Sequence, residues 1–389
     1  MAKSLHLFLL FFSFSSSNAL VYNILNFGGK PDGKSDSTKA FIKAWKAACS
    51  STSASTIYVP RGKYSLGLIK FNGPCKNNAI RFSIDGTLLA QRSKVGLGNL
   101  SQWVVFENVQ GVKIDGGNFD GKGTDLWTHK SLIHCQGCSL GASSLTFIDS
   151  KDIEITRLTS INSELYHIVI LNCKDVKVSE VKVEAPGNSP NTDGIHVQSS
   201  KDVTITKTTI KTGDDCISIG EGTVGLWIEQ VFCGPGHGIS IGSLGKEEVK
   251  EEGVENVTVK TSTFSGTENG LRIKTWASPN SGFVKGITFE DILMRDVKNP
   301  IIIDQNYCPH NIACPNQNSG IKISQVMYKN IKGSSTTQVA MNFECSASNP
   351  CSGIGLQNIA LMYEKQPSKS TCKHAQGTSS GPIIPPSCF

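Results

Sequence analysis

A short phrase recurs through the sequence and limits the folds that the chain can adopt. The segments SKDIEI, CKDVKV and SKDVTI match closely and begin at Ser150, Cys173 and Ser200, which are 23 and 27 residues apart. The weaker copies are QGVKI at Gln110, GLWI at Gly225, ENVTV at Glu255, KGITF at Lys285, SGIKI at Ser319 and SGIGL at Ser352. Self-similarity at intervals of roughly 20 to 50 residues is typical of solenoid proteins.

Each copy has the pattern of a β-strand. Apolar and polar residues alternate within it, as they do in a strand with one buried face, and Val, Ile and Thr dominate. A strand–turn unit of this size cannot bury its own apolar face, whereas a stack of such units buries a continuous one. We therefore predict an all-β chain folded as a single-stranded parallel β-helix with coils about 4.8 Å apart. In the alternative, an antiparallel β-sandwich, strands would recur about every 8–12 residues with hairpin turns.

The two ends of such a stack must be covered. The segment STKAFIKAWKAACS, residues 37–50, carries apolar residues at 40, 41, 44, 45 and 48, which fall on one helical face. With Asp36 or Ser37 as its N-cap, we expect this helix to cover the N-terminal end. The C-terminal tail is rich in Pro and Ser and contains Cys372 and Cys388, so we expect a disulfide-pinned cover at the other end.

The first 19 residues differ in composition from the rest of the chain. MAKSLHLFLLFFSFSSSNA has a basic Lys3, an apolar stretch from Leu5 to Phe14, and small residues that end at Ala19. This pattern predicts a secretory signal peptide, residues 1–19, that is cleaved after Ala19. No linker divides residues 20–389, which we expect to form a single β-helix domain.

Thirteen cysteines are typical of a secreted, oxidised protein. The closely spaced candidate pairs are Cys216–Cys233, Cys308–Cys314, Cys345–Cys351 and Cys372–Cys388, although the sequence leaves the pairing open. The odd count leaves at least one thiol unpaired within the chain. Cys135 and Cys138 form a CxxC without a second such pair or histidines at metal spacing, so no metal site is expected there.

The formal net charge of +6 at pH 7 is compatible with a polyanionic partner. No dense Lys/Arg patch is interleaved with aromatic residues, so nucleic acid is not an expected partner. The body of the chain has no apolar run of about 18 residues, so no membrane span is expected. The sequons at Asn99 and Asn256 are candidate glycosylation sites.

A second set of strand-like segments places polar residues in register. DGIHV, DCISI, HGISI and NGLRI begin at Asp193, Asp215, His237 and Asn269. In a β-helix, these first residues would lie next to one another in successive coils. Alternation then directs the apolar residues into the core and one polar row to the outer face. That outer row is His196, Ser218, Ser240 and Arg272, with Lys274 next along the same side.

The register therefore gathers the carboxyl groups of Asp193, Asp214 and Asp215 near an imidazole and two cations. Three carboxylates this close cannot all ionise at their ordinary pKa, so the pKa of at least one should be raised. A carboxylic acid beside a carboxylate base is what general acid–base catalysis requires, and in glycoside hydrolysis one protonates the leaving oxygen while another activates water. The cations would hold an anionic substrate close to these carboxylates.

Simpler explanations exist for each residue taken alone. Asp193 is followed by a glycine and Asn191 lies just before it, so both could simply belong to a turn. His237 lies between two glycines and could be a turn residue as well. Arg272 and Lys274 could form a solvated strand face. Clustered aspartates could also bind Ca²⁺. The coincidence of these residues on one register favours a functional site, and the adjacent Asp214 and Asp215 have the weakest structural explanation.

Four of these phrases, NTDGIHV, GDDCISI, GHGISIGSLG and RIKT, resemble the signature segments of polygalacturonases, glycoside hydrolase family 28. They occur in the family's order, and the resemblance extends from VYNILNFGGKPDGKSDSTKAF to the C-terminal cysteines. The N-terminal segment, with FNGPC at Phe71, is most similar to the plant pollen-type exopolygalacturonases.

The resemblance implies a right-handed β-helix, hydrolysis of α-1,4-galacturonosyl linkages with inversion, and no metal or organic cofactor. It implies that Asp214 is the general acid, that Asp193 and Asp215 activate water, and that His237 supports the acid. The implied roles of the remaining matched residues are substrate binding by Arg272 and Lys274, ordering of the site by Asn191, lining of the cleft by Tyr307, and a disulfide between Cys216 and Cys233.

Other functions remain open at this point. A pectate lyase would share the β-helix and the substrate but would need calcium, and a non-catalytic carbohydrate-binding protein would use the same scaffold. Within the family, a rhamnogalacturonan hydrolase and an endo-acting polygalacturonase are alternatives to exo action on pectin. We expect a monomer that is secreted to the cell wall, with pollen as the site suggested by the resemblance.

Overall fold

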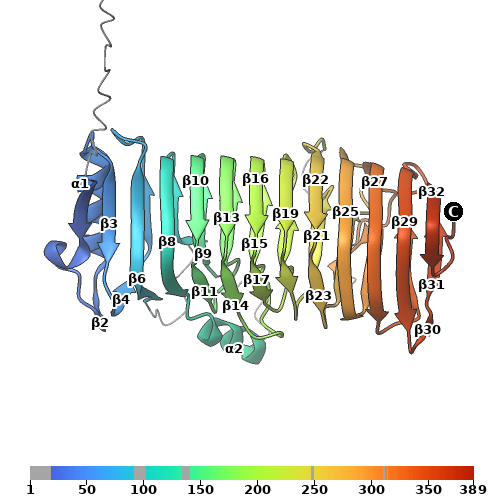
Figure 1. Cartoon of the computed structure of the whole chain (residues 1–389), viewed down its shortest axis with the longest axis horizontal. Coiled ribbons are helices and arrows are strands. Elements are labelled where there is room, and N and C mark those ends of the chain that lie inside the picture. The colour runs from blue at the N-terminus through green and yellow to red at the C-terminus, as the bar shows by residue number, and fades with distance from the viewer. Residues whose placement is uncertain (1–18, 92–101, 134–140, 247–248, 310–311, 313) are drawn as a thin grey trace, which may run out of the picture.

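The chain is an elongated stack of coils, a right-handed parallel β-helix, in the computed structural model (Figure 1). The structure describes residues 19–91, 102–133, 141–246, 249–309, 312 and 314–389, without the side chains of 129–133. The predicted fold class is confirmed. The predicted signal peptide up to residue 18, the sequon at Asn99 and the pair Cys135 and Cys138 lie outside the described residues.

One face of the stack is an 11-stranded sheet in which each strand pairs in parallel with the next one along the chain. Its strands are β5 (Ile69–Asn72), β7 (Gln102–Glu107), β9 (Ser143–Ile148), β12 (Ile168–Leu171), β15 (Ile195–Gln198), β18 (Ile217–Ile219), β21 (Ile239–Leu244), β24 (Asn269–Trp276), β26 (Asn299–Tyr307), β28 (Val339–Glu344) and β31 (Lys369–Lys373).

The rest of each coil belongs to a 21-stranded sheet that bends into two faces. The first face contains β1 (Leu20–Asn23), β3 (Ser55–Val59), β6 (Ile80–Ala90), β8 (Gln110–Asp120), β10 (Lys151–Thr156), β13 (Lys174–Ser179), β16 (Lys201–Thr206), β19 (Val224–Glu229), β22 (Val254–Lys260), β25 (Ser281–Val297), β27 (Gly320–Ser335), β29 (Cys351–Tyr363) and β32 (Ala375–Ile384).

The second face contains short strands and the far halves of the long ones. The short strands are β2 (Asp32–Asp36), β4 (Lys63–Leu66), β11 (Thr159–Ile161), β14 (Lys182–Glu184), β17 (Thr209–Lys211), β20 (Phe232–Cys233) and β23 (Thr263–Ser265). The strands β8 and β25 run through the bend, because each pairs with neighbours on both faces. The two-residue strand β30 (Gln366–Pro367) pairs antiparallel with β29.

Inward-facing apolar residues of successive coils fill the interior. The strand register aligns one such row, each member of which is at most 1% exposed. The row is Val112, Ile153, Val176, Val203, Leu226, Val257 and Ile287. These residues are the first apolar positions of the repeated phrases, so the alignment predicted from the phrases is confirmed from QGVKI to KGITF.

One predicted copy is out of register. Ile321 of SGIKI pairs with Gly282, and it is Val326 that pairs with both Ile287 and Ile354. The phrase match fails here because β27 is a 16-residue strand with several alternating apolar residues, so more than one of them can match a short apolar phrase.

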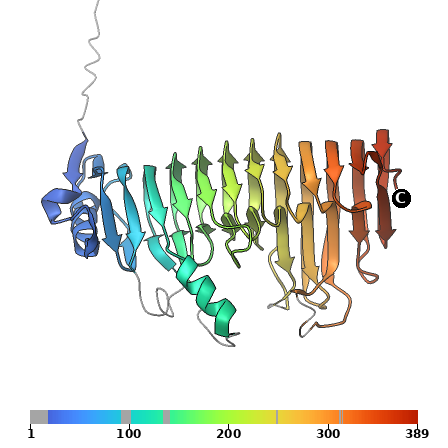
Figure 2. The same ribbon diagram turned by 90° about the horizontal axis from the view of Figure 1, so that it is seen from below.

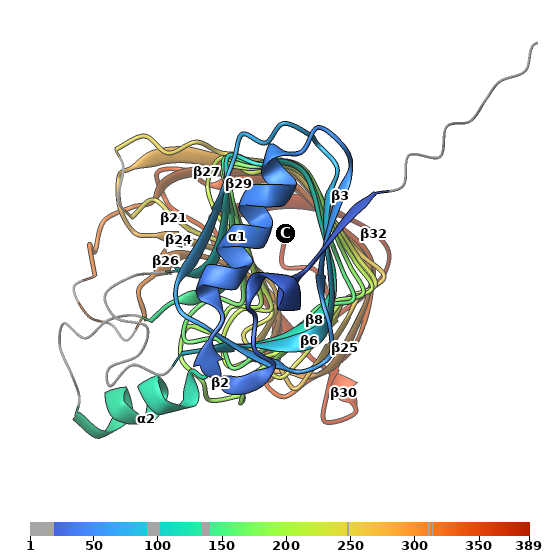
Figure 3. The ribbon, with the colours of Figure 1, turned by 90° about the vertical axis from the view of Figure 1, so that its left-hand side faces the viewer.

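The N-terminal end is covered by the helix α1 (Thr38–Ser50), as predicted (Figure 3). Its buried face includes Phe41 and Trp45, and the ring of Trp45 lies 5.4 Å from that of Phe71 in the first full coil. The carboxylate of Asp36, rather than the hydroxyl of Ser37, caps the helix by accepting a hydrogen bond from the Thr38 N–H at 2.9 Å.

The C-terminal tail covers its end of the stack and is pinned by a disulfide, as predicted. It forms β31 and β32, which continue both sheets as a last coil. The disulfide Cys372–Cys388 fastens the end of the tail to β31, and the ring of the terminal Phe389 lies 5.2 Å from that of Phe343. The tail therefore closes the stack by extending it.

A second helix, α2 (Thr124–Ile133), projects from the stack and was not predicted (Figure 2). Its apolar residues do not follow one helical face. The side chains of Leu126 and Trp127 are nevertheless buried, and the Trp127 Nε1–H donates a hydrogen bond of 3.2 Å to the Glu164 carbonyl. This contact fastens the base of the helix to the following coil.

The described residues contain five disulfides. All four closely spaced candidate pairs are present, and the fifth, Cys49–Cys75, joins the end of α1 to the loop after β5. Cys173 is a buried free thiol. Among the described residues, no helix is both long and apolar enough to cross a membrane.

Candidate active site

A cleft with a volume of about 460 Å³ lies over the outer face of the 11-stranded sheet. Its lining includes Asn191, Asp193, Asp214, Asp215, Lys274 and Tyr307, all of which were singled out from the sequence. The register of the central strands explains this grouping. Ile195 pairs with Ile217, Ile217 with Ile239, and Ile239 with Leu271, so the residues just before each strand lie in neighbouring coils.

The two adjacent aspartates sit in the turn before β18, where the chain passes very close to the preceding coil. A side chain at Gly213 would place its Cβ 2.1 Å from the carbonyl oxygen of Ser189. Gly238, with φ of +89°, approaches the backbone of Asn269 in the same way. Only glycine fits such positions, and the glycines therefore bring the aspartates and His237 against the neighbouring coils.

Asp215 lies at the floor of the cleft and is 1% exposed. One carboxylate oxygen accepts hydrogen bonds of 2.8 Å from Arg272 and from the Ser240 hydroxyl, and the other accepts one of 2.8 Å from Lys274. Burial alone would raise the pKa of Asp215, but the charges of Lys274 and Arg272 outweigh it and lower that pKa to about 2. Asp215 is therefore ionised at neutral pH.

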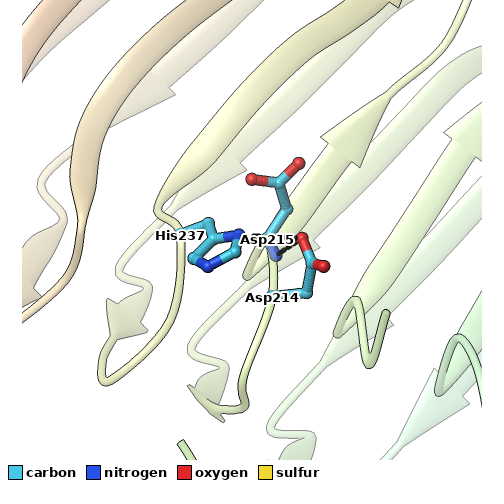
Figure 4. A group of neighbouring side chains, drawn as sticks. All are labelled: Asp214, Asp215 and His237. Carbon is cyan, nitrogen blue, oxygen red and sulfur yellow. Dashed lines mark hydrogen bonds and ion pairs between the residues drawn. The ribbon is translucent and has the colours of Figure 1, made fainter. Parts of the chain in front are cut away.

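Asp214 and His237 form a second pair nearer the surface (Figure 4). The His237 Nδ1 lies 3.1 Å from the Asp214 Oδ1, which also accepts the Asp215 backbone N–H at 2.8 Å. The Asp214 side chain is 19% exposed. The hydrogen bond with Asp214 raises the pKa of His237 despite its partial burial, and the charges of Asp214, Asp215 and Glu268 act in the same direction.

Asp193 is the carboxyl group whose pKa the site raises. Its burial, followed by the negative charges of Asp214 and Asp215, raises its pKa well above the ordinary value. The expectation of one raised pKa among three crowded carboxyl groups is thus confirmed. The resemblance implies that Asp214 is the general acid, whereas the raised pKa is that of Asp193.

The two cations bond to the buried carboxylate. Arg272 and Lys274 both pair with Asp215, so they do not form the solvated strand face that was the simpler explanation. The ring of Tyr307 covers them, with its centroid 5.2 Å from the Lys274 Nζ and 6.0 Å from the Arg272 guanidinium carbon. Asn191 lines the cleft with an exposed side chain and a left-handed backbone, φ +54°.

The sequence did not identify several residues of the cleft. Tyr166, Gln198 and Glu221 line it, and His196, which the register placed on the outer row, was given no role. The ring of Tyr166 stacks on that of His196 at 5.0 Å. The outer row itself is the signal that could have drawn attention to His196, because its neighbours in the row, Ser240 and Arg272, both bond to Asp215.

Asp214, Asp215 and His237 also form a group whose possible metal-ligating atoms lie within 4.8 Å of one another. Both oxygens of Asp215 already bond to cationic groups, so the local charge is unfavourable to a metal ion. The donor set therefore does not fit a metal site.

Comparisons with known proteins agree with this geometry. The model of glycosyl hydrolases family 28 matches residues 49–381. The chain is 53% identical to a polygalacturonase from Prunus persica over 96% of this chain and 94% of that one. It is 43% identical to an exopolygalacturonase from Platanus acerifolia over 95% and 98% of the two chains. A solved exopolygalacturonase from Thermotoga maritima superposes with a TM-score of 0.75 at 20% identity, over 92% and 90% of the chains.

Proposed function

The chain belongs to glycosyl hydrolases family 28, and we propose that it is a polygalacturonase that hydrolyses α-1,4-galacturonosyl linkages of pectin with inversion. The observation that carries this proposal is the group of three carboxyl groups and Lys274 in one cleft, with Arg272 paired to Asp215 beside it. A hydrolase of an anionic polysaccharide needs both, because the cations offset the repulsion between the substrate and the catalytic carboxylates.

Asp214 is the proposed general acid. It is the most exposed of the three carboxyl groups, since its side chain is 19% exposed while Asp215 is 1% and Asp193 is 6% exposed. It can therefore reach the leaving oxygen of a chain that lies in the cleft. Its contact with His237 allows the imidazole and the carboxyl to share a proton, which supports the resupply of the acid after each turnover.

Asp215 and Asp193 are the proposed groups that position and activate water. Asp215 has a lowered pKa of about 2, so at neutral pH it is ionised and can accept a hydrogen bond from water. Asp193 faces the same cleft, and because its pKa is raised, it must be in its ionised form before it can act as a base.

Arg272, Lys274, Tyr307 and Asn191 are the proposed substrate-binding residues. A guanidinium has five N–H donors and an ammonium has three, and the bonds to Ser240 and Asp215 leave donors of both cations for a galacturonate carboxylate. The exposed amide of Asn191 and the ring of Tyr307 line the cleft beside them.

We further propose that the enzyme is exo-acting, secreted and monomeric, and that it works in the plant cell wall, with pollen as the tissue that the resemblance suggests. The exopolygalacturonase relative at 43% identity supports the first point, and the five disulfides support an oxidising compartment. Asn256, exposed on the outer face of β22, is a proposed glycosylation site.

A time course of products from polygalacturonate, separated by chain length with and without a chelator, tests this function. We expect monogalacturonate alone from the earliest points and no effect of chelation. Oligomers of several lengths at early times would show that the enzyme is endo-acting rather than exo-acting. Unsaturated products that disappear on chelation would refute hydrolysis in favour of a lyase.

A further inference from the structure

A second pocket, with a volume of about 690 Å³, lies outside the active-site cleft. It is formed at the N-terminal ends of the neighbouring strands β16, β19, β22, β25 and β27 (Figure 1). Glu221 lines the cleft and the next residue, Gly222, lines the second pocket, so only the turn after β18 separates the two. The lining of this lysine pocket includes one aromatic ring and three lysines, which are Phe283, Lys201, Lys250 and Lys322.

The ring of Phe283 gives the lysine pocket an apolar surface that is open to solvent. The residue is 39% exposed, although it lies within a strand of the stack. Its ring occupies the space that a side chain at position 253 would fill, because a Cβ on Gly253 would lie 2.3 Å from the ring carbons Cε1 and Cζ. An exposed ring gains free energy when an apolar surface covers it, and the C–H face of a sugar ring is such a surface.

The three lysines are spread along the pocket. Lys322 is the register partner of Phe283 on the adjacent strand, and Lys250 forms a bridge with Ser281, two residues before Phe283. Lys201 begins β16, which is four strand pairings from β27 and therefore about 19 Å away. A chain of several sugars is long enough to contact all three lysines, whereas a single sugar is not.

The charges of these lysines are available to a ligand. Within the described part of the chain, none of the three forms an ion pair. Two lysines nearby on the same face differ in this respect, because Lys174 lies 3.9 Å from Asp202 and Lys285 lies 4.0 Å from Glu255. Cations without a carboxylate partner attract an anionic ligand.

Two carboxyl groups also line the lysine pocket, those of Glu251 and Glu252. Glu251 is 9% exposed, and its oxygens accept hydrogen bonds from the backbone N–H groups of Gly245 and Lys246 at 2.8 and 3.1 Å. Its charge is therefore directed into the neighbouring loop. Glu252 is the carboxylate that remains to oppose three cations, so the pocket favours an anionic ligand over a cationic one.

We propose that the lysine pocket is a second binding site for polygalacturonate, which holds the polymer on the protein without taking part in hydrolysis. An acidic polysaccharide matches both of its features, because each galacturonate has a carboxylate for a lysine and a C–H face for the ring of Phe283. The choice of polymer rests on the proposed function, since the cleft on the other side of the turn binds the same chain in that proposal.

The first test measures the binding of polygalacturonate and of trigalacturonate by titration calorimetry at low ionic strength. Asp214→Asn serves as the background, so that the polymer is not cut. We expect Phe283→Ala to weaken polymer binding about tenfold, and Lys201→Gln combined with Lys322→Gln to do the same. Binding of the trimer should not change, because the cleft is intact and the trimer does not need the second site.

The control is Met327→Ala. Met327 is 39% exposed and lies on the same strand as Lys322, but it does not line the lysine pocket. Its substitution should leave the binding of both ligands unchanged. If the Phe283 and lysine variants bind the polymer as tightly as Met327→Ala does, the proposal is overturned. The lysine variant decides the question if Phe283→Ala does not fold.

The second test is kinetic and uses the protein with Asp214 intact. Phe283→Ala should raise KM for polygalacturonate about tenfold and leave kcat unchanged, while both constants for trigalacturonate stay at their wild-type values. An equal rise in KM for the trimer would mean that the substitution acts on the cleft, and it would overturn a separate site.

The two tests separate this inference from the proposed function. A protein that binds the polymer through the lysine pocket but does not hydrolyse it would refute the proposed function alone. Hydrolysis together with polymer binding that none of the pocket variants weakens would refute the second site alone.

A glycan on Asn256, three residues after Gly253, is the other candidate occupant of the lysine pocket. In that case Phe283→Ala would leave polymer binding unchanged, and a glycosidase would remove the glycan faster from Phe283→Ala than from the wild type. This pair of results would overturn the proposal.

Discussion

The ion pair between Lys274 and Asp215 should be essential to the stability of the site. The Lys274 Nζ lies 2.8 Å from the Asp215 Oδ2, and the two side chains are 9% and 1% exposed. Lys274→Met keeps most of the side-chain volume but removes the charge. In the variant, Asp215 stays buried with Arg272 as its one remaining cation. This lowers the stability of the folded protein, because a buried charge has no water to solvate it.

The pKa of Asp215 gives the scale of the effect. It falls from an ordinary value of 3.8 to about 2 in the folded protein, which corresponds to about 2 kcal/mol of unfolding free energy. Removal of one partner from a buried pair costs up to about 5 kcal/mol. We therefore expect Lys274→Met to lose about 2 to 5 kcal/mol at pH 6.

The sign of the pH dependence follows from the lowered pKa. The contribution of Asp215 is fully present above the unfolded pKa of 3.8 and is lost as the pH falls toward the folded pKa of about 2. The difference between wild type and Lys274→Met should therefore be constant from pH 5 to 7, as both values lie well above 3.8, and should shrink below pH 4.

Urea unfolding followed by tryptophan fluorescence at several pH values measures this difference. The control is Lys285→Met, because Lys285 is 49% exposed and lies 4.0 Å from Glu255. A surface pair of this kind contributes less than about 1 kcal/mol. If Lys274→Met is no less stable than Lys285→Met at pH 6, or if its deficit persists unchanged at pH 3, the reasoning about Asp215 is refuted.

Three further predictions concern the acid, the core and the lid. Asp214→Asn should lower kcat by about a hundredfold or more without moving the urea midpoint, and near-normal turnover would contradict its role as acid. Ile217→Ala, at a core position that is 0% exposed, should cost about 2 to 5 kcal/mol in urea unfolding, and a loss below about 1 kcal/mol would mean that the coil can collapse around the cavity. Cys49→Ala with Cys75→Ala should cost about 3 kcal/mol, because the disulfide spans 26 residues, and an unchanged midpoint would show that α1 docks without it.

Much of the architecture could be predicted because each coil repeats the same alternation at the same register. The coils from Val112 to Ile287 follow this rule. The predicted register is wrong at Ile321, because the long strand β27 offers several equivalent apolar positions. The structure shows that Val326, rather than Ile321, continues the row. The helix α2 was missed because Leu126 and Trp127 are adjacent in sequence and so do not give the periodicity of an amphipathic helix.

The same rule explains what the sequence could say about the site. Period-two alternation and the coil spacing bring Asp193, Asp215 and His237 together, but they do not say which group holds a proton. That depends on the contacts of Asp215 with Arg272 and Lys274, which a strand pattern presents only as an outward-facing row. The disulfide Cys49–Cys75 was missed for a related reason, since it forms between a helix and a loop whose proximity depends on how α1 docks.

The fixed spacing of the coils determines which parts of this protein can change in length and which cannot. The residues at the floor of the cleft are held by strands whose separation is the hydrogen-bonding distance of a sheet, so their mutual positions cannot drift with changes elsewhere. The segments between the same strands differ in length: Asp215 and His237 are 22 positions apart, but His237 and Asn269 are 32 apart, and the strands that follow them still lie in register. Insertions between the strands can thus reshape the walls of the cleft while the proposed catalytic groups beneath stay in place.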